Sequence, residues 1–245
     1  MRPFLTAEWR HLVMANFAVD SAVLEPLVPA GTVLDAHQGV TYASVVAFRF
    51  LGTKVRGVPI PWHRDFEEIN LRFYVRRDHA GETRRGVVFV REVVPRHLIA
   101  WVARYAYNEP YIALRTRSRV NARIRYEYFW KQRPDWATLA AAVTGEPDVP
   151  APGSIEEFIS EHYWGYNRQR NGTTLEYRVE HPQWRVWRAR ECTFSCDVAT
   201  LYGKAFVPAL SQAPANVFVA DGSAVSVYPG APLDMGSGSG WRSAW

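Results

Sequence analysis

Lysine is scarce in this sequence, although basic residues are not. Only Lys54, Lys131 and Lys204 are lysines among 29 basic residues, so arginine supplies nearly all of the positive charge. Guanidinium groups suit bidentate recognition of phosphates and carboxylates, but the same bias also arises from codon composition. The arginines form no run longer than a pair and have acidic residues among them. We therefore do not expect the protein to bind nucleic acid.

Cysteine is almost absent, and its spacing excludes the common cysteine motifs. Cys192 and Cys196 are four residues apart, which fits neither a redox pair nor half of a zinc site. On one strand they would lie ~13 Å apart, too far for a disulfide bond. We expect two buried thiols.

Long apolar runs are also missing. No stretch approaches the ~18 apolar residues that a membrane span needs. The first twenty residues contain Glu8, Arg10 and His11 where a secretory signal would be uninterruptedly apolar. These observations predict a soluble, cytoplasmic protein without a membrane partner.

The sequence contains no signature of a common cofactor site. It has no phosphate-binding loop, no GxGxxG, no HExxH and no GxSxG, and its seven histidines show no metal-binding spacing. We expect no cofactor and no metal, although residues distant in sequence can still assemble a metal site in space.

Aromatic and apolar residues are plentiful. The 245 residues are 48% hydrophobic and include 10 Trp, 12 Tyr and 12 Phe, enough for a sizeable core. We predict one domain over residues 2–230. Residues 234–245 read as a linker-like tail rich in Gly and Ser, and we leave them out of the functional argument.

Periodicity predicts many strands and few helices. Alternation is clearest at 69–75, where Ile69, Leu71 and Phe73 share one face. Further strands are predicted at 41–51, 86–94, 120–130, 174–180, 184–193 and 224–228. Helices are predicted at 21–28 after an Asp20 cap, at 97–107, after a capping box at Ser154, and near 197–206. We predict a loop at 52–61, and at 135–153 an irregular segment on the surface without strand periodicity.

This order of elements favours a mainly β (α+β) fold. Few helices separate the strands, which argues against a doubly wound α/β sheet. An antiparallel curved sheet or barrel with a few peripheral helices fits better.

The strongest chemical signal lies on the polar face of the 69–75 strand. Glu68, Asn70 and Arg72 follow one another at ~7 Å intervals on that face. In an open sheet they would form a solvated surface. In a closed sheet they would line the interior, where a carboxyl with a raised pKa can act as an acid or a base.

The chain resembles the acetoacetate decarboxylase-like superfamily, and within it the bacterial branch of YqjF-like (DUF2071-type) proteins. The resemblance rests on the opening Glu8–Asp20, on Leu24–Pro29, on Phe66-Glu67-Glu68 and on Ala103–Pro110, and it covers residues 2 to 230. It implies a conical antiparallel β-barrel with a central cavity.

The resemblance also implies an arginine, a glutamate and a Schiff-base lysine with a second lysine beside it. Arg10 and Glu68 fall where the arginine and the glutamate lie. Tyr111 and Ile112 stand where the lysines would be, and neither side chain can condense with a ketone.

Two classes of function follow, with a structural or oligomer-forming module as a third. The first is an enzyme acting by acid–base chemistry, without a Schiff base, on a small carboxylate- or carbonyl-bearing molecule, as a lyase, dehydratase, cyclase or hydrolase. Arg10 would hold the anion, Glu68 would move a proton, and Tyr111 would donate to a developing oxyanion. The alternative is a non-catalytic protein that binds a small molecule in the cavity. Ligand contacts are predicted at Asn70, Arg72, Tyr74 and Arg104, and homo-oligomer formation is left open.

Overall fold

The structure, a computed structural model, describes residues 1–60, 64–95, 110–121 and 124–233. The helix predicted at 97–107, the candidate Arg104 and the tail at 234–245 lie outside these residues. Strands dominate the described part, as the periodicity predicts.

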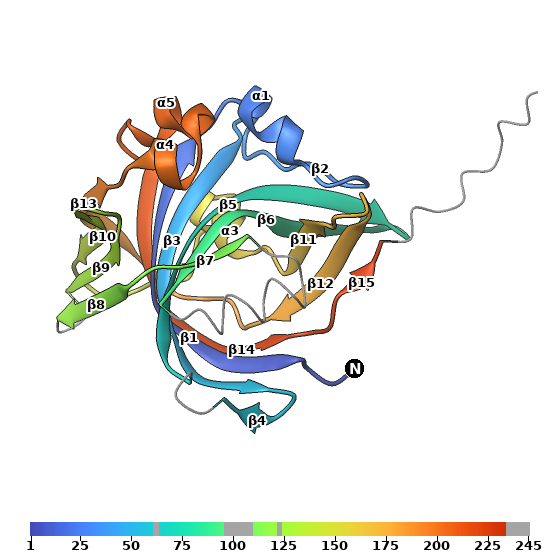
Figure 1. Cartoon of the computed structure of the whole chain (residues 1–245), viewed down its shortest axis with the longest axis horizontal. Coiled ribbons are helices and arrows are strands. Elements are labelled where there is room, and N and C mark those ends of the chain that lie inside the picture. Colours follow the sequence, from blue (N-terminus) through green and yellow to red (C-terminus); the bar gives the residue numbers. More distant parts are fainter. Residues whose placement is uncertain (61–63, 96–109, 122–123, 234–245) are drawn as a thin grey trace, which may run out of the picture.

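A closed ring of strands forms the centre of the molecule (Figure 1). Neighbours in the ring follow the order β12-β11-β6-β5-β3-β1-β14, and β14 pairs with β12 to close it. The bounds are β1 (Leu5–Ala18), β3 (Tyr42–Val55), β5 (Phe66–His79), β6 (Glu82–Val94), β11 (Trp164–Arg168), β12 (Thr174–Glu180) and β14 (Asn216–Val227). Most pairs are antiparallel, but β6 runs parallel to β11. The closed ring gives the sheet an interior face.

A second group of strands extends from β14 on the outside of the ring. It contains β13 (Val186–Ser195), β10 (Trp136–Val143), β9 (Arg125–Lys131) and β8 (Thr116–Asn121), paired in that order. Short strands pair with strands of the ring: β2 (Val33–Leu34) with β5, β4 (Val58–Pro59) with β3, β7 (Tyr111–Ala113) with β6, and β15 (Ala231–Pro232) with β12. The pairing of β7 with β6 is parallel.

Within the described residues the helices are short, and most lie outside the ring. They are α1 (Ser21–Leu24), η1 (Glu25–Leu27), α3 (Ile155–Ser160), α4 (Val198–Leu201), η2 (Lys204–Phe206) and α5 (Val207–Leu210). Helix α3 is the exception, because its Phe158 and Ile159 side chains are buried with the inward-facing residues of the ring. Two predicted caps are confirmed: Asp20 accepts a hydrogen bond from the Ala22 amide, and Ser154 accepts one from the Glu157 amide.

Three predicted segments differ from the structure. The single strand predicted at 120–130 is a hairpin of β8 and β9, because the same alternation continues on both sides of the turn. The irregular segment predicted at 135–153 contains β10, an alanine-rich strand held by pairing on both sides. The loop predicted from residue 52 begins later, because β3 runs on to Val55 and pairs with β4.

The two faces of β5 divide the molecule into two cores. Ile69, Leu71 and Phe73 are completely buried in an outer core with residues of α4 and β9. Tyr74 faces inward and belongs to an inner core inside the ring. The predicted alternation of this strand is confirmed, and its polar residues therefore face the interior.

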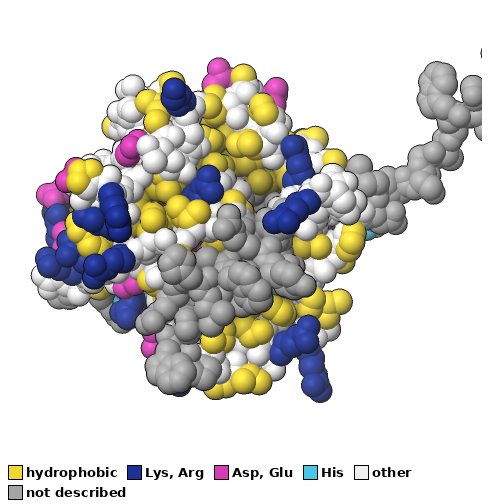
Figure 2. Space-filling model, viewed as in Figure 1, with side chains coloured by type: hydrophobic (Ala, Val, Ile, Leu, Met, Phe, Trp, Pro, Cys, Tyr) yellow, Lys and Arg dark blue, Asp and Glu magenta, His cyan; other side chains and the backbone are white. Residues whose placement is uncertain are grey.

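The surface carries no single-sign face in the view of Figure 2. Lys and Arg side chains gather there over the β8–β9–β10–β13 end, with acidic side chains among them. Within the described residues, no helix is long and apolar enough to cross a membrane.

Candidate functional site

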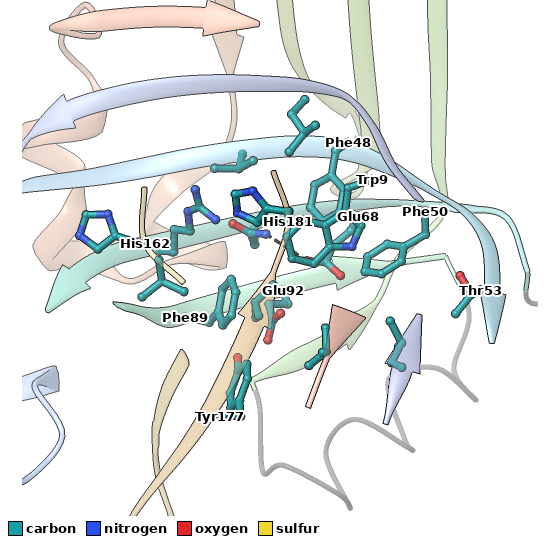
Figure 3. A pocket seen from close by; sticks show the side chains of 18 of the residues that line it. Trp9, Phe48, Phe50, Thr53, Glu68, Phe89, Glu92, His162, Tyr177 and His181 are labelled. Atoms are coloured by element: carbon teal, nitrogen blue, oxygen red, sulfur yellow. Dashed lines mark hydrogen bonds between the residues drawn. The ribbon is translucent and has the colours of Figure 1, made fainter. Parts of the chain in front are cut away.

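A cavity of about 240 Å³ lies inside the ring. Its wall is mostly apolar, with Trp9, Phe48, Phe50 and Phe89 among the lining residues. Figure 3 shows His162 at one end of the cavity, Thr53 at the other, and Glu68 and Glu92 between them. A few polar side chains in an apolar enclosure are typical of a small-molecule site.

Glu68 lies in this cavity on the inner face of β5, with only 3% of its surface exposed. Its carboxyl group accepts two hydrogen bonds, one from Asn70 Nδ2 at 3.0 Å and one from the Tyr111 hydroxyl at 3.1 Å. Tyr111 reaches it from β7, which pairs with β6 directly beside β5. Residues of two strands, β5 and β7, thus fix the position of one carboxyl group.

Burial raises the pKa of Glu68 from 4.5 to about 7. The hydrogen bonds from Asn70 and Tyr111 and the charge of Arg72 act in the opposite direction but do not offset the loss of solvation. Glu68 is therefore poised to gain or lose a proton near neutral pH.

Among the described residues, Arg72 is the arginine that lines the cavity. It lies four residues after Glu68 on the same face, and its charge also lowers the pKa of His162 and of His181. Its Nε atom is buried and makes no hydrogen bond, and its guanidinium forms no ion pair with a described residue. The Asn70 Oδ1 atom is likewise buried without a partner. These two groups are suited to binding an anion with polar substituents.

Two histidines in the cavity wall are held as neutral rings. Burial lowers the pKa of His162 to about 4, although its Nε2 lies 3.2 Å from an Asp35 carboxylate oxygen. Burial also lowers the pKa of His181, whose Nδ1 donates to the Pro182 carbonyl oxygen at 2.9 Å. That bond leaves the lone pair of His181 on Nε2, and stacking on Trp184 at 4.0 Å fixes the ring.

Arg10 does not take the place predicted for it. It pairs with Glu8 at 2.9 Å and with Asp221 at 3.6 Å, and it is not part of the cavity wall. The expectation that Arg10 faces Glu68 across the cavity is wrong. A bulge between Arg10 and Val13, with His11 at φ 60°, places Trp9 and Leu12 in the wall instead.

The other candidates are placed as follows. Glu68, Asn70, Arg72 and Tyr111 come together in the cavity. Tyr74 faces the same interior, but its hydroxyl lies 2.6 Å from Ser44 Oγ and it is not part of the cavity wall. Arg104 lies outside the described residues. The catalytic and ligand-binding roles of all these residues remain predictions.

None of the three lysines is part of the cavity wall. Lys54 belongs to β3 rather than to the loop predicted for it, Lys131 ends β9, and Lys204 begins η2. The two cysteines are free and half-buried. No group of three His, Cys, Asp or Glu side chains suited to a metal ion occurs within the described ranges.

Comparison with known proteins decides the family. The family model DUF2071, described as "Uncharacterized conserved protein (COG2071)", matches residues 6–224. The chain belongs to this family. Protein YqjF of Bacillus subtilis (strain 168), named "Uncharacterized protein YqjF", is 28% identical over 201 residues, which are 78% of each chain.

Solved structures place this DUF2071 protein in the acetoacetate decarboxylase-like fold. The acetoacetate decarboxylase of Legionella pneumophila matches with a TM-score of 0.67 at 11% identity, over 95% of this chain and 88% of that one. The enduracididine biosynthesis enzyme MppR, in complex with pyruvate, matches with a TM-score of 0.64 at 12% identity, over 95% and 91%. At these identities the similarity shows the fold.

Sequence reasoning did not find several polar residues of this DUF2071 cavity. Glu92, His162 and His181 line it, but no motif surrounds them. Glu92 had one usable signal, since it interrupts an apolar strand and lies opposite Asn70. The two histidines follow α3 and β12, in irregular segments whose position no periodicity predicts.

Proposed function

We propose that this protein is an acid–base enzyme for a small carboxylate that also carries a carbonyl group, such as a 2-oxo acid. The observation that carries the proposal is the buried Glu68 carboxyl, with a pKa of about 7, on the same face of β5 as Arg72. An ionisable group near neutral pH and a cation without an ion-pair partner among the described residues are the two elements that this chemistry needs.

Each residue has a distinct part in the proposed reaction. Arg72 binds the carboxylate of the substrate. The ionised Glu68 then removes a proton from the carbon beside the carbonyl group, and the electron pair moves to the carbonyl oxygen. Protonation removes the negative charge of Glu68 and weakens its hydrogen bond with the Tyr111 hydroxyl. That hydroxyl then donates its hydrogen bond to the developing oxyanion instead.

The proposed chemistry proceeds without a covalent amine intermediate. The chain has three lysines, and none of them lines the cavity. Position 111, where the resemblance implies a reactive lysine, holds a tyrosine whose hydroxyl bonds Glu68. We therefore do not assign decarboxylation through an imine. Removal of a proton beside the carbonyl group is a first step that lyase, dehydratase and cyclase reactions can share, whereas a hydrolase would use Glu68 to activate water.

The neighbour MppR has been solved in complex with pyruvate. This supports a 2-oxo acid as the substrate class to test first. Pyruvate is also a convenient probe, because removal of a proton from its methyl group in D₂O replaces hydrogen by deuterium even when no further reaction occurs.

The test is the rate at which the pyruvate methyl signal disappears in the proton NMR spectrum in D₂O. We expect the protein to accelerate exchange above the buffer rate, and Glu68→Gln to reduce this acceleration by about 10² or more. Glu67→Gln is the matched control, because Glu67 faces outward and bonds Thr116 and Ser118. No exchange above the buffer rate, or equal rates in all three proteins, would contradict the proposal.

A non-catalytic binding protein is the second candidate, favoured by the mostly apolar wall of the cavity. It predicts saturable binding of a small acid, measurable by calorimetry, together with no catalysed exchange. The two candidates are therefore separated by the same NMR experiment.

A further inference from the structure

The inner face of β5 changes character along its length. Phe66, Glu68, Asn70 and Arg72 succeed one another on this face at ~7 Å intervals, and all four line the cavity. An aromatic ring stands at one end of the row and a guanidinium at the other. A ligand lying along this row meets an apolar surface, a proton-transfer group and a cation in that order.

The aromatic end of the row is wider than Phe66 alone. Strand pairing puts Phe50 opposite Phe66, and Trp9 opposite Phe50 on the next strand. The rings of Phe50 and Phe66 stack at 4.6 Å with planes 13° apart. Trp9 meets Phe48 and Phe50 edge-on at 5.3 Å and 5.8 Å, and all of these residues line the cavity.

The register connects this aromatic wall directly to the proposed acid–base group. Phe48 lies opposite Glu68, so one member of the wall is the cross-strand neighbour of the carboxyl. Figure 3 shows Trp9, Phe48 and Phe50 on the same side of the cavity as Thr53, with His162 at the far side. The apolar end therefore lies away from the His162 end, where the charge of Arg72 contributes to the lowered pKa of that histidine.

Pyruvate is too small to contact this aromatic wall while it is bound at Arg72. Its methyl group cannot cover several aromatic side chains while its carboxylate is held at Arg72. A planar ring attached one or two carbons from the reacting carbon would lie against them, and aromatic pairs prefer the offset and edge-on arrangements already present in this wall.

We propose that the substrate of this cavity is an aryl-substituted oxo acid, with its carboxylate at Arg72 and its aromatic ring against Trp9, Phe48, Phe50 and Phe66. The orientation of the reacting carbon toward Glu68 rests on the proposed function. The aryl subsite itself rests on the register and the ring contacts.

Inert carboxylates test the subsite without any chemical step. Calorimetry compares propanoate, hexanoate and 3-phenylpropanoate with the intact chain. We expect 3-phenylpropanoate to bind about 30-fold or more tighter than propanoate, and tighter than hexanoate. Equal affinities for propanoate and 3-phenylpropanoate would overturn the proposal, and a preference for hexanoate would replace the aryl group by a linear chain.

Two substitutions locate the binding. Phe50→Leu is expected to lower the affinity for 3-phenylpropanoate at least threefold and to leave the affinity for propanoate unchanged. Phe17→Leu is the matched control, since Phe17 is also buried but belongs to the outer core, where its ring meets Phe194. If Phe17→Leu lowers the affinity for 3-phenylpropanoate as much as Phe50→Leu does, the assignment of the aryl subsite is wrong.

The failure of this inference and the failure of the proposed function are distinguishable. Pyruvate exchange without an aryl preference overturns only the aryl subsite. Tighter binding of 3-phenylpropanoate without catalysed pyruvate exchange overturns the proposed enzymatic function. The protein would then be a binding protein for aryl-substituted acids.

Discussion

Glu67 and Glu68 are adjacent and chemically identical, yet they have different surroundings. Glu67 faces outward and accepts hydrogen bonds from the hydroxyl groups of Thr116 and Ser118, which tie β8 to β5. Glu68 faces the cavity and is almost completely buried. Alternation along one strand predicted this difference from the sequence. Alternation alone could not predict the raised pKa of Glu68, because the shift depends on closure of the ring, which only the resemblance implied.

The first prediction concerns Glu68 and pH. Because its folded-state pKa of about 7 exceeds the ordinary 4.5, the folded state resists ionisation, and its stability falls as pH rises from 4.5 to 7. Glu68→Gln removes this loss. We expect the variant to gain roughly 2 to 3 kcal/mol relative to the native protein between pH 5 and pH 8.

Urea unfolding of both proteins at the two pH values measures this difference. Taking the difference between the proteins cancels every group whose titration is the same in both. A gain that is the same at both pH values would show that Glu68 has an ordinary pKa.

At the scale of elements, the bulge of β1 decides what faces the cavity. Leu5, Ala7 and Trp9 face inward before it, and Leu12 and Met14 face inward after it. Regular alternation would keep Arg10 and Leu12 on one face. The sequence shows no glycine or proline at this point of β1, so the bulge and the outward position of Arg10 could not be predicted.

Gly222 on β14 lies opposite Arg10, where the bulge of β1 begins. It has φ +87°, and a Cβ there would stand 2.0 Å from the backbone oxygen of Trp9. We expect Gly222→Ala to destabilise the protein by more than about 2 kcal/mol, from strain and clash together.

Gly81→Ala separates backbone strain from the steric clash, because Gly81 also has a positive φ, +82°, but has open space around it. Its expected cost is about 1 kcal/mol. Thermal unfolding of both variants checks the difference, and equal losses would mean that the close approach to Trp9 is unimportant.

The strands outside the ring also limited prediction from sequence. The strands β8 and β9 share one sequence alternation on either side of their turn, and β10 has a composition of low strand propensity. Both are fixed by pairing with partners distant in sequence, and local patterns carry no information about such partners.

At the scale of the whole molecule, the mainly β architecture followed from alternation, and the resemblance added the closed arrangement with its cavity. The fold agrees with both. The composition of the cavity did not follow from either, since strands β1, β3, β5, β6 and the segments before β11 and after β12 all contribute to its wall.

The position of the lysines gives a prediction about the intact protein. Because Lys54, Lys131 and Lys204 lie outside the cavity wall, treatment with acetoacetate or pyruvate and borohydride is expected to give no reduced adduct. Mass spectrometry of the intact chain and of peptides covering the three lysines checks this. A stoichiometric adduct on one of them would revive chemistry through an imine.

The most direct measurement for the central claim is the pH dependence of pyruvate methyl exchange, followed by NMR from pH 5 to pH 9. If ionised Glu68 removes the proton, the catalysed rate rises with pH and levels off with an apparent pKa of about 7. Arg10→Ala follows the same curve, because Arg10 lies outside the cavity wall, and Glu68→Gln shows no such rise. A catalysed rate that keeps the same curve in Glu68→Gln would contradict the account.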